Sequence, residues 1–272
     1  MRLEVQELGF GYPGKAVGRD VTFKVDPGEV VVLLGPNGCG KTTLFKTILN
    51  LLPRQAGDVS VDGRSTRSFT RNELARAIAY VPQAYAGYFP FTLLDTVLMG
   101  RTAHIALFAS PTKSDRAQAA HMLEFMGIGH LREEPYTAVS GGQRQLALIA
   151  RALVQEARIL VMDEPTASLD FGNQVKVLDV IRSLAAEGMG IILSTHDPDH
   201  AFLCGHRVAM MKDGRLYRIG SAEEVITSQS LRHVYGVDIE VRAIDVVTPK
   251  GTRQIRVCLP TEIAAQAAAR VH

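Results

Sequence analysis

A glycine-rich loop at residues 35–43 carries the residue types that bind phosphate groups. The loop reads Gly35, Pro36, Asn37, Gly38, Cys39, Gly40, Lys41, Thr42 and Thr43. Gly35, Gly40 and the Lys-Thr pair that follows satisfy the spacing G-x-x-x-x-G-K-[ST]. Glycines let backbone N–H groups converge on the α- and β-phosphates, the lysine reaches the β- and γ-phosphates, and the threonine hydroxyl can bind Mg²⁺. The loop therefore predicts a site for a nucleoside triphosphate with Mg²⁺.

Two adjacent carboxylates, Asp163 and Glu164, follow the apolar run at residues 159–162. Because neighbouring side chains at the end of a strand point in different directions, the two acids can serve different partners. We expect Asp163 to join the Mg²⁺ shell and Glu164 to orient or deprotonate the attacking water. An acid pair of this kind, taken alone, is more often a solvated strand end. The phosphate loop upstream favours the catalytic interpretation.

A third candidate is the sequence Val139, Ser140, Gly141, Gly142 and Gln143, which precedes apolar residues at helical spacing. A serine before the open N–H groups of a first helical turn can cap the helix or help to bind an anion. By itself a Ser-Gly-Gly helix start is more often a plain cap. Its position between the phosphate loop and the acid pair makes it a candidate anion site.

The elements predicted around these motifs give an α/β fold. Strand patterns cover residues 2–7, 21–25, 29–34, 57–63, 159–162 and 190–194, and helical patterns cover 44–52, 72–79 and 173–186. The apolar runs before the phosphate loop and before the acid pair are typical of strands buried on both faces of a parallel sheet. Residues 2–7 and 21–25 alternate, which favours an antiparallel element at the start of the fold.

Domain organisation follows from the same patterns. We expect an α/β core at residues 1–83 and 155–225 and a mainly helical insertion at 84–154. A C-terminal extension at 226–272 contains a predicted β-hairpin, with strands at 237–247 and 253–259 after a small helix at 222–226. We expect this hairpin to be a packed tail; a regulatory or dimer-stabilising appendage is the alternative.

Composition limits the partners. The chain has 30 Lys and Arg against 28 Asp and Glu, and this net charge of +2 is far from the basic field that nucleic-acid binding requires. Its three cysteines are widely spaced without a C-x-x-C pair, which predicts neither a disulfide framework nor a zinc site and fits a reducing compartment. No apolar run approaches the roughly 20 residues that cross a bilayer, and the N-terminus does not resemble a signal peptide. We expect a cytoplasmic chain with at most peripheral membrane contact.

The order of these motifs resembles the ATP-binding-cassette (ABC) family over about residues 1–225. Ser-Gly-Gly-Gln after a complete phosphate loop and before Asp163 and Glu164 is the signature that separates this family from other P-loop NTPases. The resemblance implies a P-loop NTPase (RecA-like) core with a parallel sheet, an N-terminal antiparallel β subdomain and a helical insertion subdomain. Val139 departs from the family pattern, which usually has leucine there, and this conservative change alters little.

The resemblance also implies individual roles. Tyr12 resembles the aromatic residue that stacks on adenine, with Phe10 as the competing candidate. Gln83 resembles the glutamine that reaches Mg²⁺ and the lytic water, and His196 the histidine that contacts the γ-phosphate. Asp170 lies in a segment, 168–170, that resembles the loop crossing to a partner subunit. The implied nucleotide contacts are therefore Tyr12, residues 35–43, Ser140, Gly141, Gly142, Gln143 and Asp170. The implied Mg²⁺ ligands are Thr42, Gln83 and Asp163, and the implied catalytic residues are Glu164, His196 and Gln83.

The implied assembly is a head-to-tail dimer. Ser140 and Gly142 of one copy would close over the ATP that Lys41 and Thr42 of the other copy hold. Two transmembrane permease subunits, and indirectly a periplasmic or surface substrate-binding protein, complete the expected partners. The expected location is the cytoplasmic face of the cell membrane.

A charge-poor aromatic stretch is the candidate surface for a permease. Between residues 84 and 111 it contains Tyr85, Tyr88, Phe89, Phe91 and Phe108. That these aromatics fill the core of the insertion is an equally good interpretation.

Two segments, 76–83 and 95–104, resemble ATPases of metal-chelate importers, which serve ferric siderophores, haem, cobalamin and molybdate. Residues 97–110 resemble the molybdate or tungstate branch most. A soluble ABC ATPase not coupled to transport, or an ATPase of another ABC transporter class, remains the alternative. A DNA-repair ATPase would carry a long coiled-coil insertion and a ribosome-associated one two tandem cassettes, and this chain has neither pattern. A nucleotide kinase or GTPase would not need residues 140–143, and no Asn-Lys-x-Asp motif for guanine is present.

Overall fold

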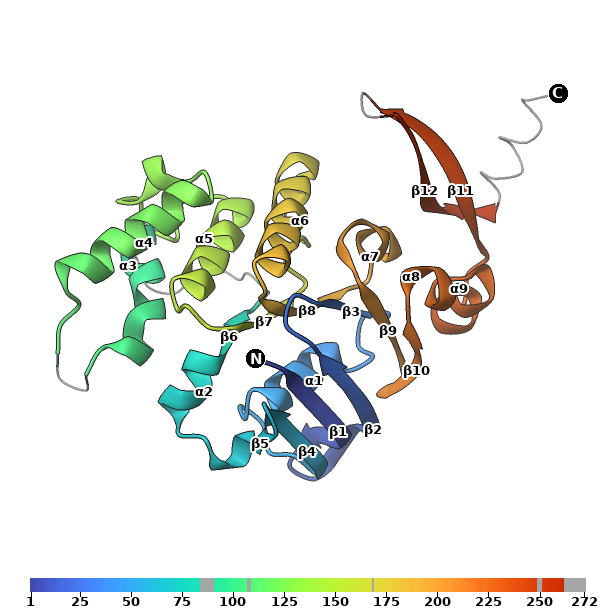
Figure 1. The fold of residues 1–272 in the computed structure, drawn as a ribbon, viewed down its shortest axis with the longest axis horizontal. Coiled ribbons are helices and arrows are strands. Elements are labelled where there is room, and N and C mark those ends of the chain that lie inside the picture. Colours follow the sequence, from blue (N-terminus) through green and yellow to red (C-terminus); the bar gives the residue numbers. More distant parts are fainter. Residues whose placement is uncertain (84–90, 107–108, 168, 249–250, 262–272) are drawn as a thin grey trace.

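A central six-stranded sheet forms the core of the computed structural model, which describes residues 1–83, 91–106, 109–167, 169–248 and 251–261 (Figure 1). The strand order is β10 (Arg215–Gly220), β9 (Arg207–Lys212), β3 (Val30–Leu34), β8 (Gly190–Thr195), β7 (Ile159–Asp163) and β6 (Ile78–Val81). All of these strands run parallel except β10, which pairs antiparallel with β9. Every residue of β3, β7 and β8 is buried, as their continuous apolar runs predicted. The predicted α/β class is confirmed.

A second, antiparallel sheet covers one face of this core. Its strands are β2 (Lys15–Val25), β1 (Leu3–Tyr12), β4 (Ala56–Val61) and β5 (Arg64–Ser65). Helix α1 (Lys41–Ile48) packs with both sheets. Side chains of β3 alternate between the two faces of the central sheet. Val31 and Leu33 pack in the hydrophobic core on the side of α1 and the antiparallel sheet, whereas Val30, Val32 and Leu34 pack in the core on the opposite face.

Helices cover the other face of the central sheet. They include α3 (Leu93–Leu98), α4 (Lys113–Phe125), α5 (Gly141–Leu153), α6 (Phe171–Ala186) and α7 (Pro198–Cys204). Short 3₁₀ turns follow α3 as η2 (Met99–His104) and α4 as η3 (Gly129–Leu131), and η1 (Thr66–Ser68) precedes α2 (Arg71–Ala77). A buried guanidinium ties the helical segment together: Arg101 donates to Asp115 Oδ1 at 3.0 Å and to the Val154 carbonyl at 3.0 Å.

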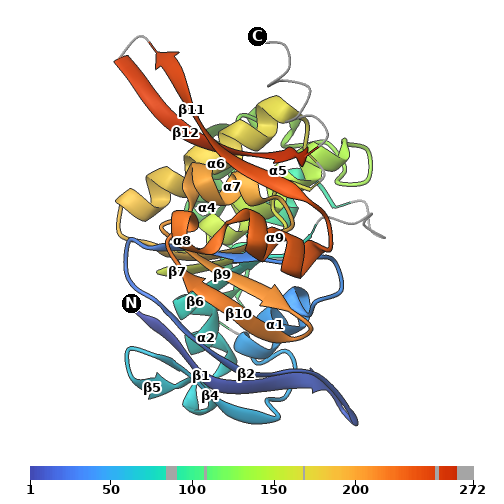
Figure 2. The ribbon, with the colours of Figure 1, turned by 90° about the vertical axis from the view of Figure 1, so that its right-hand side faces the viewer.

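The C-terminal segment continues as α8 (Ala222–Val225), α9 (Ser228–Tyr235), β11 (Ile239–Thr248) and β12 (Gly251–Pro260). The last two pair over ten positions as the predicted hairpin. Figure 2 shows this hairpin passing in front of α7, with α9 below its lower end. The sequence patterns did not predict α7, β9, β10 or α9.

Two predicted helices have different limits in the structure. The helix predicted at 72–79 ends at Ala77, because Ile78 and Ala79 already pair with Ile159 and Leu160 in the parallel sheet. The helix predicted at 44–52 begins at Lys41 and ends at Ile48, and Asn50 then adopts the left-handed conformation with φ 56°.

Candidate functional site

The phosphate loop lies between the end of β3 and the start of α1, as its sequence position predicted. Gly38 and Gly40 have φ values of 80° and 105°, a conformation that residues with a Cβ rarely adopt. A Cβ at Gly35 would lie 2.6 Å from the Met211 carbonyl oxygen, so this position also has no room for a side chain. Gly40 begins α1 without a side-chain cap. The N–H groups of the first helical turn are therefore left for a ligand.

Lys41 holds its ammonium group over this loop. Its Nζ donates to the carbonyls of Gly35 at 2.7 Å and Pro36 at 3.1 Å. The same Nζ lies 3.5 Å from Glu164 Oε1, and the lysine is only 5% exposed. A buried cation beside open N–H groups gives the loop a strongly positive local field, which suits a polyphosphate.

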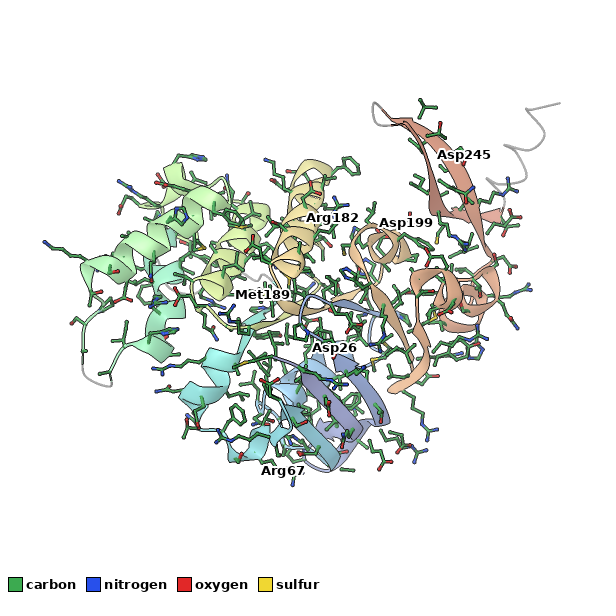
Figure 3. The ribbon with its side chains drawn as sticks, viewed as in Figure 1. Asp26, Arg67, Arg182, Met189, Asp199 and Asp245 are labelled. Atoms are coloured by element: carbon green, nitrogen blue, oxygen red, sulfur yellow. The ribbon has the colours of Figure 1, made fainter. Side chains whose placement is uncertain are left out.

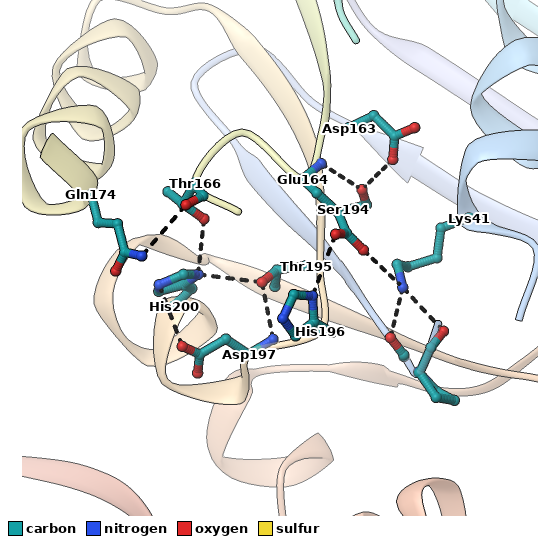
Figure 4. A network of polar contacts seen from close by, with 12 residues as sticks. Lys41, Asp163, Glu164, Thr166, Gln174, Ser194, Thr195, His196, Asp197 and His200 are labelled. Atoms are coloured by element: carbon teal, nitrogen blue, oxygen red, sulfur yellow. Dashed lines mark hydrogen bonds and ion pairs between the residues drawn. The ribbon is translucent and has the colours of Figure 1, made fainter. Parts of the chain in front are cut away.

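The two carboxylates at the end of β7, that of its last residue Asp163 and that of the next residue Glu164, point to different partners, as Figure 4 shows. Asp163 is 2% exposed, and its Oδ1 accepts a hydrogen bond from Ser194 Oγ at 2.7 Å. The same Ser194 oxygen accepts from the Glu164 backbone N–H at 3.0 Å. Glu164 has φ 47°, and this turn of the backbone carries its side chain between Lys41 and His196. His196 Nδ1 lies 3.4 Å from Glu164 Oε2, so Lys41, Glu164 and His196 form one chain of contacts.

An open cavity of about 420 Å³ unites several of the predicted residues. It is lined by Val17, Asn37, Gly38, Gly40, Lys41, Thr42, Thr43, Gln83 and Glu164. Thr42 and Gln83 are exposed within the cavity, whereas Cys39 lies buried beneath the loop. Burial raises the pKa of the Cys39 thiol, although the nearby Lys41 ammonium opposes this effect.

The structure separates the two aromatic candidates for adenine. Phe10 is 0% exposed, and its ring packs against the backbone of Gly18 and Gly40. It has no free face for a base. Tyr12 is 43% exposed at the end of β1 and does not line the cavity itself. The β1–β2 hairpin nevertheless brings it near, because Val17 of β2 is a lining residue.

The Ser-Gly-Gly-Gln signature lies outside this cavity. Ser140 caps α5: its Oγ accepts from the Gln143 N–H at 3.2 Å, and its own N–H donates to Gln143 Oε1 at 2.9 Å. Asp170 caps α6 through the Asn173 N–H at 2.8 Å. Ser168 lies outside the described residues. Within one chain, the structure therefore does not bring Ser140, Gly141, Gly142, Gln143 or Asp170 to the phosphate loop.

Sequence reasoning missed several residues that support the site. Ser194 bridges Asp163 and Glu164, and its place at the end of a predicted strand was the only available signal. Tyr235 Oη donates to the His196 carbonyl at 3.3 Å, and no pattern indicated this contact. His200 is buried, and its Nδ1 lies 3.3 Å from Thr195 Oγ1. Burial lowers the pKa of His200.

Two features are absent from the residues that the structure describes. None of their helices has both the length and the apolar character needed to cross a membrane. Nor do three or more His, Cys, Asp or Glu residues in the described ranges gather into a group that could hold a metal ion.

Comparison with known proteins identifies the family. The profile of the ABC transporter family matches residues 19–167. An uncharacterized ABC transporter ATP-binding protein of Haemophilus influenzae is 41% identical over 241 residues, which cover 89% of this chain and 92% of that protein. The iron(3+)-hydroxamate import ATP-binding protein FhuC of Bacillus subtilis is 33% identical, with 88% and 89% covered. Other relatives are named for molybdate import, ferric enterobactin transport and cobalamin import.

A solved structure agrees with these relatives. An ABC transporter described as of metal-chelate type, in an inward-facing conformation, superimposes with a TM-score of 0.82. It is 30% identical, and the match covers 96% of this chain and 98% of that one. The resemblance inferred from the motifs is thereby confirmed. The chain belongs to the ABC transporter family and is one of its ATP-binding subunits, which hydrolyse ATP to power transport.

Proposed function

We propose that this chain powers an importer of a metal chelate or an oxyanion, docked to the cytoplasmic face of the membrane. The observation that carries the proposal is the single cavity in which the phosphate loop, Gln83 and Glu164 meet, in a chain similar to import subunits along most of its length. Its relatives are named for several different chelates, so the proposal extends to the class of substrate only.

The residues of the cavity fit Mg²⁺ bound with ATP. Thr42 and Gln83 offer a hydroxyl and an amide oxygen, and Asp163 offers a carboxylate directly beside the cavity residue Glu164. These are the hard oxygen donors that Mg²⁺ prefers, although Asp163 itself does not line the cavity. The bound ion supplies charge neutralisation at the β- and γ-phosphates.

Each remaining residue then has a role in hydrolysis. Lys41 leaves the carbonyls of its own loop to bind the β- and γ-phosphates. Glu164 positions the attacking water and accepts its proton, because its carboxylate lines the cavity beside the phosphate loop, where Lys41 and His196 contact it from either side. His196 contacts the γ-phosphate. Tyr12 covers the adenine from the end of β1.

The signature residues act on the site of a second copy. Ser140 keeps a free hydroxyl proton while its oxygen caps α5, so it can donate to a phosphate oxygen presented from outside. Gly141 and Gly142 leave the helix N-terminus open to the same anion. A head-to-tail dimer would place Ser140, Gly142 and Asp170 of one copy against the cavity of the other, which makes hydrolysis conditional on closure.

A groove between the core and the helical segment is the proposed permease contact. Its volume is about 850 Å³, and its lining includes Leu51, Phe69, Leu74, Tyr80 and Met99. Leu51 and Met99 are 63% and 42% exposed and lie in one groove with other apolar side chains, and a contiguous apolar surface of this kind marks an interaction site. We assign an apolar cytoplasmic helix of the permease to this groove. Tyr85, Tyr88, Phe89 and Phe108 of the aromatic stretch lie outside the described residues, and Phe91 is 48% exposed.

Charge substitutions test the groove. Leu51→Asp and Met99→Asp should each abolish recovery of the chain with its permease subunits. Leu203→Asp is the matched control, because Leu203 is 52% exposed on α7 outside the groove. Equal recovery of all three variants would overturn the groove assignment.

Recovery of the membrane complex tests the function itself. The purified complex should hydrolyse ATP faster when one class of chelate, presented on its binding protein, is added. Ferric hydroxamate, molybdate and cobalamin are the three probes. A chain found in ribosome or nucleoid fractions and absent from membranes would instead favour a soluble ABC ATPase.

A further inference from the structure

The C-terminal segment contacts the catalytic region at His196, a contact that the motifs of the family core do not explain. Tyr235, the last residue of α9, places its hydroxyl 3.3 Å from the His196 carbonyl. The two residues are separated by 39 positions in sequence. The His196 ring then reaches Glu164, which in turn reaches Lys41 (Figure 4). Tyr235 therefore stands at the outer end of a chain of contacts that leads to the phosphate loop.

Tyr235 is held in place by a well-fixed helix. Leu231 and Val234 of α9 are 0% and 6% exposed in the core cluster of the central sheet. Lys212 Nζ donates to the His233 carbonyl at 2.7 Å, which ties α9 to β9. Gly236 ends the helix in the left-handed conformation at φ 72°, directly after the tyrosine. The Tyr235 hydroxyl can therefore move little unless the packing of α9 is disturbed.

The hairpin makes a second contact on the same region. The Cys258 N–H of β12 donates to Asp199 Oδ1 at 3.1 Å. Asp199 lies in the first turn of α7, three residues after His196, and Figure 3 shows it on the part of α7 near the hairpin. The Val241 N–H of β11 donates to Ser228 Oγ at 3.2 Å, which joins the hairpin to α9 as well. Hairpin, α9 and the start of α7 thus form one connected unit.

We propose that Tyr235 is a positioning residue for His196, and that the C-terminal segment sets the backbone from which this histidine reaches Glu164 and the nucleotide. The hydrogen bond from Tyr235 to the His196 carbonyl adds an anchor from outside to the loop after β8, which also holds itself through the Asp197 N–H bond to Thr195 Oγ1 at 3.0 Å. The His196 ring is 50% exposed and has little packing of its own, so its backbone anchor determines its position. The C-terminal hairpin is then more than a packed tail. This inference rests on the proposed role of His196 in hydrolysis.

The test uses Tyr235→Phe in the full-length chain, because this change removes only the hydroxyl. We expect kcat for ATP hydrolysis to fall about three- to tenfold, the effect of one lost hydrogen bond on the placement of His196 while ATP reacts. KM for ATP and the melting temperature should stay close to those of the unmodified chain. Tyr217→Phe is the matched control: Tyr217 lies on β10, and its ring stacks on His233 at 4.6 Å without reaching the site.

Ring-labelled histidine gives a second readout that packing alone would not change. The His196 signal, assigned with His196→Ala, should move in Tyr235→Phe. The signal of His206 should not move, because its Nδ1 accepts from the Val30 N–H at the start of β3, whereas His196 follows the other end of the parallel strand β8. A lower kcat together with a shifted His196 signal supports positioning. An unchanged kcat, or a lower kcat with an unchanged His196 signal, overturns it. If His196→Ala itself hydrolyses ATP normally, the proposed role of His196 fails, and the positioning inference fails with it.

Discussion

Replacing Tyr12 by alanine should weaken ATP binding while leaving the fold intact. Tyr12 is the exposed aromatic residue at the end of β1, and 43% of its surface is free to meet a base. Stacking of a base on an aromatic side chain contributes ~1–3 kcal/mol. Because Tyr12 lies at the exposed edge of the site, where water also reaches the ring, we expect the lower part of that range, ~1–2 kcal/mol, or about a 5- to 30-fold rise in Kd. Titration calorimetry of ATP with Mg²⁺ into the full-length chain measures this change.

Two controls make the result specific to the ring. Tyr12→Phe keeps the stacking face, so its Kd should remain within about twofold. Phe10→Ala empties a buried position and should lower stability by ~3–5 kcal/mol, so its main effect appears in the melting temperature. An unchanged Kd in Tyr12→Ala, or an equal loss in Tyr12→Phe, would refute the assignment of Tyr12 to adenine.

Three further predictions concern stability and thiol chemistry. Arg101→Ala removes a buried guanidinium that joins Asp115 to the Val154 carbonyl, so it should lower the melting temperature by about 5–10 °C. Arg116→Ala is the control, because Arg116 belongs to an exposed ion pair and its loss should change the melting temperature little. Equal effects of the two substitutions would contradict this prediction. The Thr112 hydroxyl and N–H, with Arg101, lower the pKa of Asp115 from 3.8 to about 2, so its carboxylate stabilises the fold above pH 4 and this contribution is lost as the pH falls towards 2. Thermal melts at pH 5 and pH 2 should show this loss in the unmodified chain and less of it in Asp115→Asn. Burial raises the pKa of the Cys39 thiol, so a bulky maleimide should react with it slowly at pH 7. Because Cys39 belongs to the phosphate loop, the attached reagent should block ATP binding, and ATP bound beforehand should prevent labelling. Labelling without loss of ATP binding would contradict the placement of the loop.

Local patterns predicted the parts of the site that depend on local geometry. The phosphate loop was predictable because glycines at this spacing indicate a backbone with positive φ, and Gly38 and Gly40 have such values. The buried strands before it and before Asp163 were predictable because they are short, continuous apolar runs. Separate partners for Asp163 and Glu164 were predicted from strand alternation, but β7 ends at Asp163, and the left-handed φ of Glu164 is what turns its side chain towards Lys41.

Contacts between distant residues were not predictable in the same way. Phe10 and Tyr12 are both aromatic residues near the end of one strand, and only the packing of Phe10 against Gly18 and Gly40 separates them. The helix predicted through Ala79 ended early because pairing with β7 outweighed local helix preference. The Tyr235 hydroxyl donates to the backbone carbonyl of His196, and this contact could not be predicted because every residue has a backbone carbonyl, whatever its type.

The claim that each ATP site is completed by a second copy has one direct test, the mass of Glu164→Gln in the presence of ATP and Mg²⁺. The substitution removes the carboxylate that accepts the water proton but keeps the phosphate loop, so ATP should remain bound and hydrolysis should be lost. Light scattering should then give twice the mass of the chain, and adding Ser140→Arg should return it to a monomer. A monomer with ATP bound, or near-normal hydrolysis by Glu164→Gln, would contradict the account.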